Sequence, residues 1–179
     1  MKRLGHLAII AHDMGLIFEF LALITLVPFI VLILFREWEM IIPMGAVPFI
    51  FIVTGLLISR VPKKAYTPSL SVALVAVALT WLAIAAVGAV PFVLALDLSW
   101  TDSIFEAMSG WTGTGFTMMT SLDTMPRTLI FWRSFMQWIG GIGVIAFGIA
   151  MLSRSGLTQI QLYRSEGRSE ELMPSVVST

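Results

Sequence analysis

Cysteine is absent from this chain of 179 residues, which excludes disulfide bonds and thiolate metal sites. Charged residues are also scarce, at 12%, whereas soluble globular domains carry roughly a quarter. Lysine plus arginine and aspartate plus glutamate are balanced at 11 each, so net charge gives no indication of a nucleic-acid partner. With 58% hydrophobic residues, this composition predicts an all-α integral membrane protein whose surroundings are the lipid bilayer.

Four apolar runs are long enough to cross a membrane, since about 20 helical residues span about 30 Å. The first lies within the apolar stretch Leu7–Phe35, where we expect Pro28 to kink the helix. Pro43 and Pro48 are expected to interrupt the second. The predicted spans cover residues 16–35, 40–59, 69–96 and 128–152.

These runs divide the chain into three predicted parts. Residues 1–60 form an N-terminal transmembrane hairpin, and residues 61–153 form a repeat of outer helix, short helix, loop and inner helix. Residues 154–179 form a polar cytoplasmic tail. Positive charge is retained in the cytoplasm, so the distribution of basic residues predicts the orientation. One side holds Lys2, Arg3, Arg60, Lys63, Lys64, Arg154, Arg164 and Arg168, and the other holds Arg36, Arg127 and Arg133. Both termini are therefore expected in the cytoplasm.

The segment between the third and fourth spans is too short to cross. Residues 99–109 are predicted to form an amphipathic helix capped by Ser99 or Thr101, and residues 110–125 a loop. Irregular backbone at membrane depth is tolerated only where it lines a cavity, because exposed carbonyls cannot face lipid. A short helix that directs its carbonyl end toward the membrane centre also favours cations. The pattern therefore predicts that the short helix and its loop re-enter from outside and line an ion path.

Thr112, Gly113, Thr114 and Gly115 follow this short helix. The glycines let successive carbonyls point the same way, and the threonines can add hydroxyl oxygens. In a soluble protein the same residues would indicate a simple turn. Their position beside a membrane span favours an ion pore instead.

The residues that carry a family resemblance extend over most of the chain. They are Gly88-Ala89-Val90-Pro91-Phe92, Phe105-Glu106-Ala107-Met108-Ser109-Gly110, Thr112-Gly113-Thr114-Gly115, Leu122-Asp123, Trp132-Arg133, Gln137-Trp138-Ile139-Gly140-Gly141-Ile142-Gly143 and Gln161-Leu162-Tyr163-Arg164. This set resembles the first pore repeat of the Trk/Ktr/HKT superfamily of potassium transporters, and most closely its bacterial and archaeal Trk membrane subunit.

The resemblance implies that residues 112–115 form a selectivity filter, with Gly115 at the position of the family's filter glycine. Backbone oxygens of Thr112, Gly113 and Thr114 would then bind K⁺ during uptake across the cytoplasmic membrane. Gly113 departs from the family, which commonly has threonine there, and leaves Na⁺ as a second candidate ion. No cofactor is expected.

Five further residues are predicted to support the filter: Glu106, Ser109, Gly110, Arg133 and Gln137. Glu106 could deepen the cation well or hydrogen-bond backbone amides behind the filter, and the second role is favoured. Arg133 and Gln137 lie one helical turn apart, so both can reach the loop or a neighbouring repeat.

The resemblance also implies partners. The family's pore has four repeats, so three further repeats are expected, from the same gene or from other copies. A homodimer and cytoplasmic nucleotide-binding regulatory subunits are implied in the same way. Two alternatives stay open: a non-conducting interaction protein or remnant, and a homotetrameric channel of single repeats. An enzyme is not expected, because Ser109 and Thr112 have no histidine nearer in sequence than His12.

Overall fold

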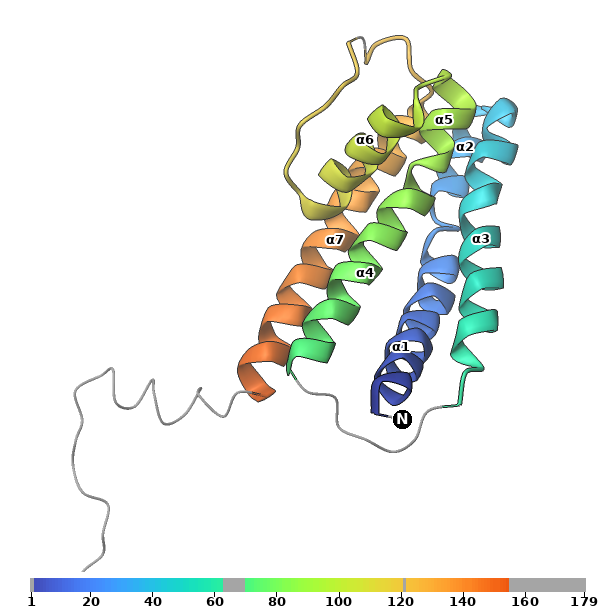
Figure 1. Ribbon diagram of the computed structural model, residues 1–179. Coiled ribbons are helices and arrows are strands. Elements are labelled where there is room, and N and C mark those ends of the chain that lie inside the picture. The colour runs from blue at the N-terminus through green and yellow to red at the C-terminus, as the bar shows by residue number, and fades with distance from the viewer. Residues whose placement is uncertain (1, 63–69, 121, 155–179) are drawn as a thin grey trace, which may run out of the picture. The chain divides into compact units, whose positions relative to one another are not determined.

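The computed structural model describes residues 2–62, 70–120 and 122–154, all discussed below as the described part of the chain. The predicted tail and most of the basic connection after residue 60 lie outside it. The chain divides into two compact units, residues 1–141 and 142–179. In the second unit the described residues are the C-terminal part of helix α7, and all other described residues belong to the first unit (Figure 1).

Helices account for the regular structure of the described residues. In chain order these are α1 (Lys2–Ile24), α2 (Pro28–Phe35), the 3₁₀ turn η1 (Trp38–Met40), α3 (Ile41–Ser59), α4 (Leu70–Gly88), α5 (Val90–Leu96), α6 (Trp100–Thr112) and α7 (Arg127–Arg154). Four stretches are long and apolar enough to cross a membrane: Leu7–Phe35, Trp38–Ser59, Ser71–Leu96 and Arg127–Ile149. The predicted all-α integral membrane fold is confirmed.

Proline acts differently in the first two spans. Pro28 has no N–H to continue the ladder of α1, and the helix breaks at residues 25–27 before α2 resumes. By contrast, α3 runs without a break from Ile41 to Ser59 with Pro48 inside it. The expected interruption at Pro43 and Pro48 is therefore wrong. Pro43 falls in the first turn of α3, where a missing N–H costs no intrahelical bond.

Close packing of small residues holds α1 against α3. A Cβ at Gly15 would stand 2.5 Å from the backbone nitrogen of Ser59, and one at Gly55 would stand 3.0 Å from Glu19. The Ser59 hydroxyl donates to Glu19 Oε1 at 2.6 Å, which gives that carboxylate a partner within the span. These contacts make the first two spans a tightly packed hairpin.

The third span breaks between α4 and α5. Because Phe92 N–H donates to the Ala89 carbonyl, the Gly88 carbonyl is left without its usual helical donor. The indole N–H of Trp132 on α7 supplies the missing bond at 3.1 Å, and both groups are buried. Trp132 also meets Trp111 of α6 edge to face, with ring centroids 6.1 Å apart. Trp132 thus joins the break in the third span to α6 and α7.

Helix α6 is short, and the chain after it returns to the end at which the helix began (Figure 1). Its 13 residues extend about 20 Å, too little to cross the hydrocarbon. The expected helix over residues 99–109 is confirmed in kind, but it ends at Thr112, three residues later than predicted. This later end places Thr112 in the last helical turn.

Candidate cation-binding site

The sequence of α6 determines which of its faces is buried. At the N-terminus, Ser99 Oγ accepts the Asp102 N–H at 3.1 Å, so Ser99 is the cap and Thr101 is not. The buried positions then recur at helical spacing: Ser103, Glu106, Ala107 and Gly110. Glu106 is fully buried on this face, which places a carboxylate behind the chain that follows the helix.

The end of α6 and the chain after it depend on two glycines with left-handed backbone. Gly113 (φ +72°) closes the helix, and its N–H donates to the Gly110 carbonyl at 3.0 Å. Gly115 (φ +84°) redirects the chain, which continues without regular structure through Met119. The stretch from Thr114 to Met119 is called the return segment below. Of the predicted filter residues, Thr112 and Gly113 therefore end the helix, while Thr114 and Gly115 begin the return segment.

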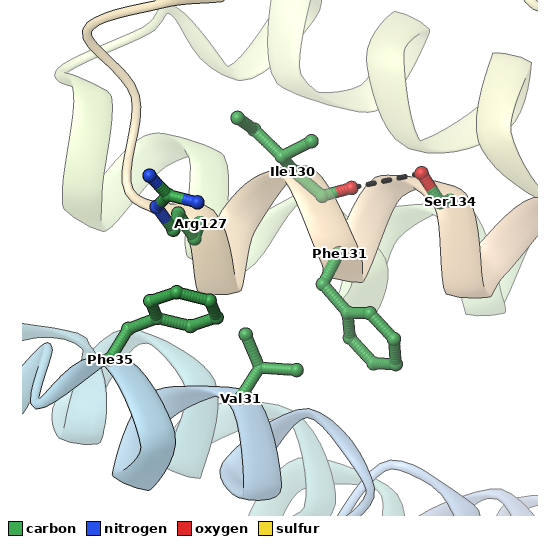
Figure 2. Close-up of a pocket in the computed structure, with 6 residues that line it drawn as sticks. All are labelled: Val31, Phe35, Arg127, Ile130, Phe131 and Ser134. Carbon is green, nitrogen blue, oxygen red and sulfur yellow. Dashed lines mark hydrogen bonds between the residues drawn. The ribbon is translucent and has the colours of Figure 1, made fainter.

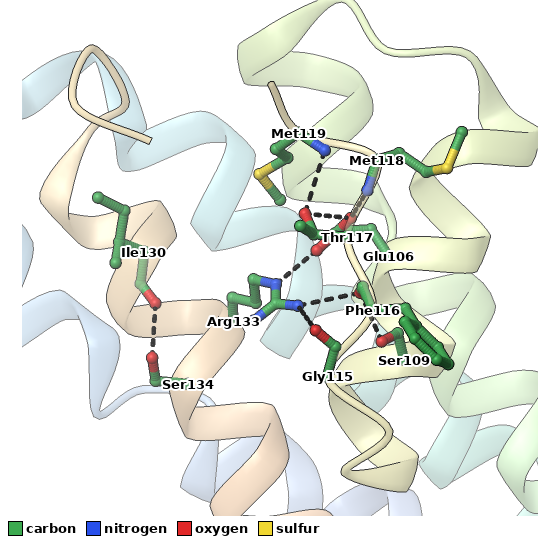
Figure 3. A network of polar contacts seen from close by, with 10 residues as sticks. All are labelled: Glu106, Ser109, Gly115, Phe116, Thr117, Met118, Met119, Ile130, Arg133 and Ser134. Atoms are coloured by element: carbon green, nitrogen blue, oxygen red, sulfur yellow. Dashed lines mark hydrogen bonds and ion pairs between the residues drawn. The ribbon is translucent and has the colours of Figure 1, made fainter. Parts of the chain in front are cut away.

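Glu106 ties this segment to α6 (Figure 3). Its Oε2 accepts the backbone N–H of Met118 at 2.9 Å and the Thr117 hydroxyl at 3.0 Å. Its Oε1 accepts the Nε–H of Arg133, which approaches from α7. The buried carboxylate is thus paired with a cation and fully hydrogen-bonded, as a charge in an apolar interior must be.

Arg133 extends this network to the carbonyls of the return segment (Figure 3). Its Nη2 donates to the Gly115 carbonyl at 3.1 Å and to the Phe116 carbonyl at 3.0 Å. The Ser109 hydroxyl donates to the same Phe116 oxygen at 2.6 Å. These two carbonyls are therefore held by protein donors on α6 and α7.

The carbonyls of Thr112, Gly113 and Thr114 differ from those two. No hydrogen bond described in this part of the chain ends on their oxygens, and all three residues are exposed. They lie at the C-terminal end of α6, where the helix dipole favours a cation. What remains free at this end of the helix is thus a run of acceptors without protein donors.

The hydroxyls of Thr112 and Thr114 add to this run. Thr112 Oγ1 donates its one proton to the Met108 carbonyl at 2.8 Å, so in the 2.7 Å contact between the two hydroxyls Thr114 must be the donor. Both protons are then used, and the Thr114 oxygen keeps its lone pairs. The exposed end of α6 therefore presents oxygen acceptors, the ligands that hard cations prefer.

The positions of the last two predicted support residues, Gly110 and Gln137, follow from packing. A Cβ at Gly110 would stand 3.1 Å from Met136 Cε, so this glycine permits the close approach of α6 and α7. The Gln137 Nε2 atom lies 3.8 Å from the position of a Cβ at Gly115. Of the five residues predicted as support, Glu106, Ser109 and Arg133 hydrogen-bond to the return segment and Gln137 lies beside it, whereas Gly110 packs against α7.

Sequence reasoning missed Glu37, which holds the start of α7. Its Oε1 accepts the Arg127 N–H at 2.7 Å and its Oε2 accepts the Thr128 N–H at 2.8 Å. These are free amide donors of a helix N-terminus, so Glu37 caps α7 from the turn between α2 and η1. Ninety residues separate the partners, and no local pattern marks such a pair.

The capping role of Glu37 lowers its pKa. Burial acts to raise it, but hydrogen bonds from Thr128 and from the backbone of Arg127, with the charge of Arg127, outweigh burial and hold the pKa below its usual 4.5. A carboxyl with a lowered pKa in the folded protein stabilises it fully above the unfolded value, and the contribution disappears as pH falls through the folded value.

Replacing Glu37 with glutamine is therefore expected to lower the thermal unfolding temperature of the purified chain near neutral pH, with a loss of about 1 kcal/mol. The difference from the unchanged protein should shrink as pH falls below 4.5, since Glu37 then loses its charge in both states. The neighbouring exposed Glu39 provides the control, because Glu39→Gln should change neither quantity. A pH-independent difference would contradict the assigned charge effect.

Comparison with known proteins identifies the family. The family model described as "TrkH: Cation transport protein" matches residues 40–179, more than three quarters of the chain. The chain belongs to the TrkH family of cation transport proteins. This confirms the resemblance to the Trk membrane subunit.

Individual relatives of the chain support this family assignment. An uncharacterized cation transporter of Methanocaldococcus jannaschii is 38% identical over 177 residues, 95% of this chain and 36% of that protein. The Trk system potassium uptake protein TrkH of Escherichia coli K12 is 41% identical over 92 residues, 50% of this chain and 19% of that protein. The Trk system potassium uptake protein TrkG of the same strain is 25% identical over 98% of this chain and 37% of its own length. The chain thus spans little more than a third of two of these relatives and matches about a fifth of the other, and all three are named as transport or uptake proteins.

Proposed function

We propose that this chain supplies one quarter of a potassium-selective pore for K⁺ uptake across the cytoplasmic membrane. The observation that carries the proposal is that the backbone carbonyls around Gly115 fall into two groups, one hydrogen-bonded by protein side chains and one not. Those of Gly115 and Phe116 are bound by Arg133 and Ser109, whereas those of Thr112, Gly113 and Thr114 are exposed acceptors at the negative end of α6. K⁺ sheds water on entry, and such oxygens replace it.

One such set of oxygens surrounds only part of an ion, so we infer that three further repeats complete the ring, from the same gene or from other copies. The complete transporter would pair as a homodimer and bind cytoplasmic nucleotide-binding regulatory subunits, as the Trk resemblance implies. The orientation proposed from the basic residues places both termini in the cytoplasm and the return segment toward the outside. Na⁺ is the second candidate ion because of Gly113.

The chain alone offers the first test. Liposomes that contain only these 179 residues should take up no rubidium tracer, and uptake should appear when the missing repeats are supplied. Uptake by the chain alone would instead favour a homotetramer of single repeats. No uptake in any combination would favour a non-conducting interaction protein.

Replacing Gly115 with valine in the complete assembly is expected to abolish K⁺-selective uptake. A β-branched residue at φ +84° is strained by about 1–2 kcal/mol, so the return segment must shift and move the adjacent Thr114 carbonyl. Membrane insertion should be unaffected, because position 115 lies outside the membrane-spanning helices and a Cβ there would meet Gln137 Nε2 at an ordinary 3.8 Å.

Gly45→Ala is the matched control for this experiment. Gly45 lies in α3, and a Cβ there would meet Phe29 Cζ at 3.9 Å. Rubidium tracer uptake, with and without competing Na⁺, measures both variants. Unchanged, K⁺-selective uptake by Gly115→Val would overturn the filter assignment.

A further inference from the structure

A groove lies between α2 and the beginning of α7 (Figure 2). Val31 and Phe35 line it from α2, and Ile130, Phe131 and Ser134 line it from α7, with Arg127 at one end. Its volume of about 420 Å³ falls within the range of ligand sites in proteins. A groove of this kind can hold part of a lipid molecule.

The two ends of the groove differ in polarity. The hydroxyl of Ser134 donates to the Ile130 carbonyl at 3.1 Å, so its one proton is already used within α7 (Figure 2). The lining beside it is otherwise hydrocarbon. At the opposite end stands the exposed guanidinium of Arg127, 4.7 Å from the centroid of the Phe35 ring. The groove therefore combines an apolar floor with a single cationic end.

The polar and apolar ends of the groove match the polar and apolar layers of a membrane. Phe35 ends one membrane-spanning stretch and Arg127 begins another, so the cationic end lies at the level where hydrocarbon gives way to headgroups. Val31 and Ser134 lie about 6 Å and 10 Å deeper along their helices. A phospholipid in a bilayer has the same arrangement, with its phosphate at the interface and its chains inside.

The guanidinium of Arg127 can contact such a phosphate. Its charge also acts on the nearby carboxylate of Glu37, but that carboxylate accepts its hydrogen bonds from the backbone of Arg127 and from Thr128. The Arg127 guanidinium lies over the face of the Phe35 ring. Stacking on a ring leaves guanidinium N–H groups free for a bidentate contact with phosphate.

We propose that this groove binds an anionic phospholipid of the surrounding membrane. Its phosphate contacts Arg127, and one acyl chain lies along Val31, Ile130 and Phe131. A net negative headgroup is preferred to a zwitterionic one, because the latter places its own cation beside the guanidinium. The proposal takes this groove to face the lipid, and it holds whether or not the chain conducts ions.

Site-directed photocrosslinking tests it. The full 179-residue chain carries the photoreactive amino acid p-benzoylphenylalanine in place of Phe131 and is reconstituted in equal amounts of phosphatidylglycerol and phosphatidylcholine. Mass spectrometry of the adducts should show phosphatidylglycerol enriched about fivefold. The same replacement at Leu34, which is 71% exposed and outside the groove lining, should capture the two lipids in their bilayer ratio.

Two variants connect the enrichment to the cation. Arg127→Gln should remove it and Arg127→Lys should retain most of it, while thermal unfolding confirms that both are folded. Equal capture of the two lipids at position 131 would overturn the proposal. So would an adduct with the mass of a second copy of the chain, or enrichment that persists in Arg127→Gln.

Discussion

Replacing Gly140 with alanine is expected to prevent α6 and α7 from packing together. A Cβ at this position would overlap the carbonyl oxygen of Trp111 and stand 2.7 Å from its carbonyl carbon. These are backbone atoms in α6, so no side-chain rotation relieves the overlap and one helix must move. The loss should exceed about 3 kcal/mol, the upper range for overpacked cores, although alanine is a better helix former than glycine.

The adjacent glycine provides the control for this experiment. A Cβ at Gly141 would meet no atom within 4 Å, so Gly141→Ala should stabilise α7 by up to about 1 kcal/mol through helix propensity alone. Thermal unfolding of the detergent-purified chain, followed by tryptophan fluorescence, measures both. Similar unfolding temperatures for the two variants would contradict the packing described for α6 and α7.

Replacing Glu106 with alanine is expected to have a comparable effect for an electrostatic reason. The substitution leaves the Nε–H of Arg133, the Met118 N–H and the Thr117 hydroxyl without their acceptor. Removing one partner of a buried ion pair typically costs about 3–5 kcal/mol. The return segment also loses its tie to α6, so K⁺ uptake by the complete assembly should fall with stability.

A double-mutant cycle separates the ion pair from its surroundings. If the pair is coupled, removing Arg133 as well should cost less than the sum of the two single substitutions, because no unpaired charge remains. Glu106→Gln, which keeps an acceptor oxygen but no charge, should fall between the unchanged protein and Glu106→Ala. Additive losses in unfolding free energy would show that Glu106 and Arg133 do not act as a pair.

Hydrophobic pattern sufficed to predict the four spans, because each is a long apolar run that must be helical in lipid, but it did not predict the break between α4 and α5. The end of α6 could not be placed from it, since Trp111-Thr112-Gly113 suits either a turn or a helix closed by glycine. In the structure Gly113 takes the left-handed cap, and Thr112 stays helical. The prediction that Thr112 to Thr114 coordinate an ion stays a prediction.

Glu106 and Arg133 were each expected beside the loop, but their pairing was not foreseen. They are 27 residues apart on different helices, and only the packing of α6 on α7 brings them together. The capping role of Glu37 was harder to predict, because a glutamate in a charged turn is ordinarily solvated. Its role depends on where α7 begins in space, which no local pattern encodes.

The carboxylate of Glu37 makes the start of α7 depend on a segment far away in the chain. The cap comes from the turn between α2 and η1, ninety residues before the helix begins. Without that turn, the amides of Arg127 and Thr128 would have to take their hydrogen bonds from water. An excised α6–α7 fragment should therefore fray at this end of α7.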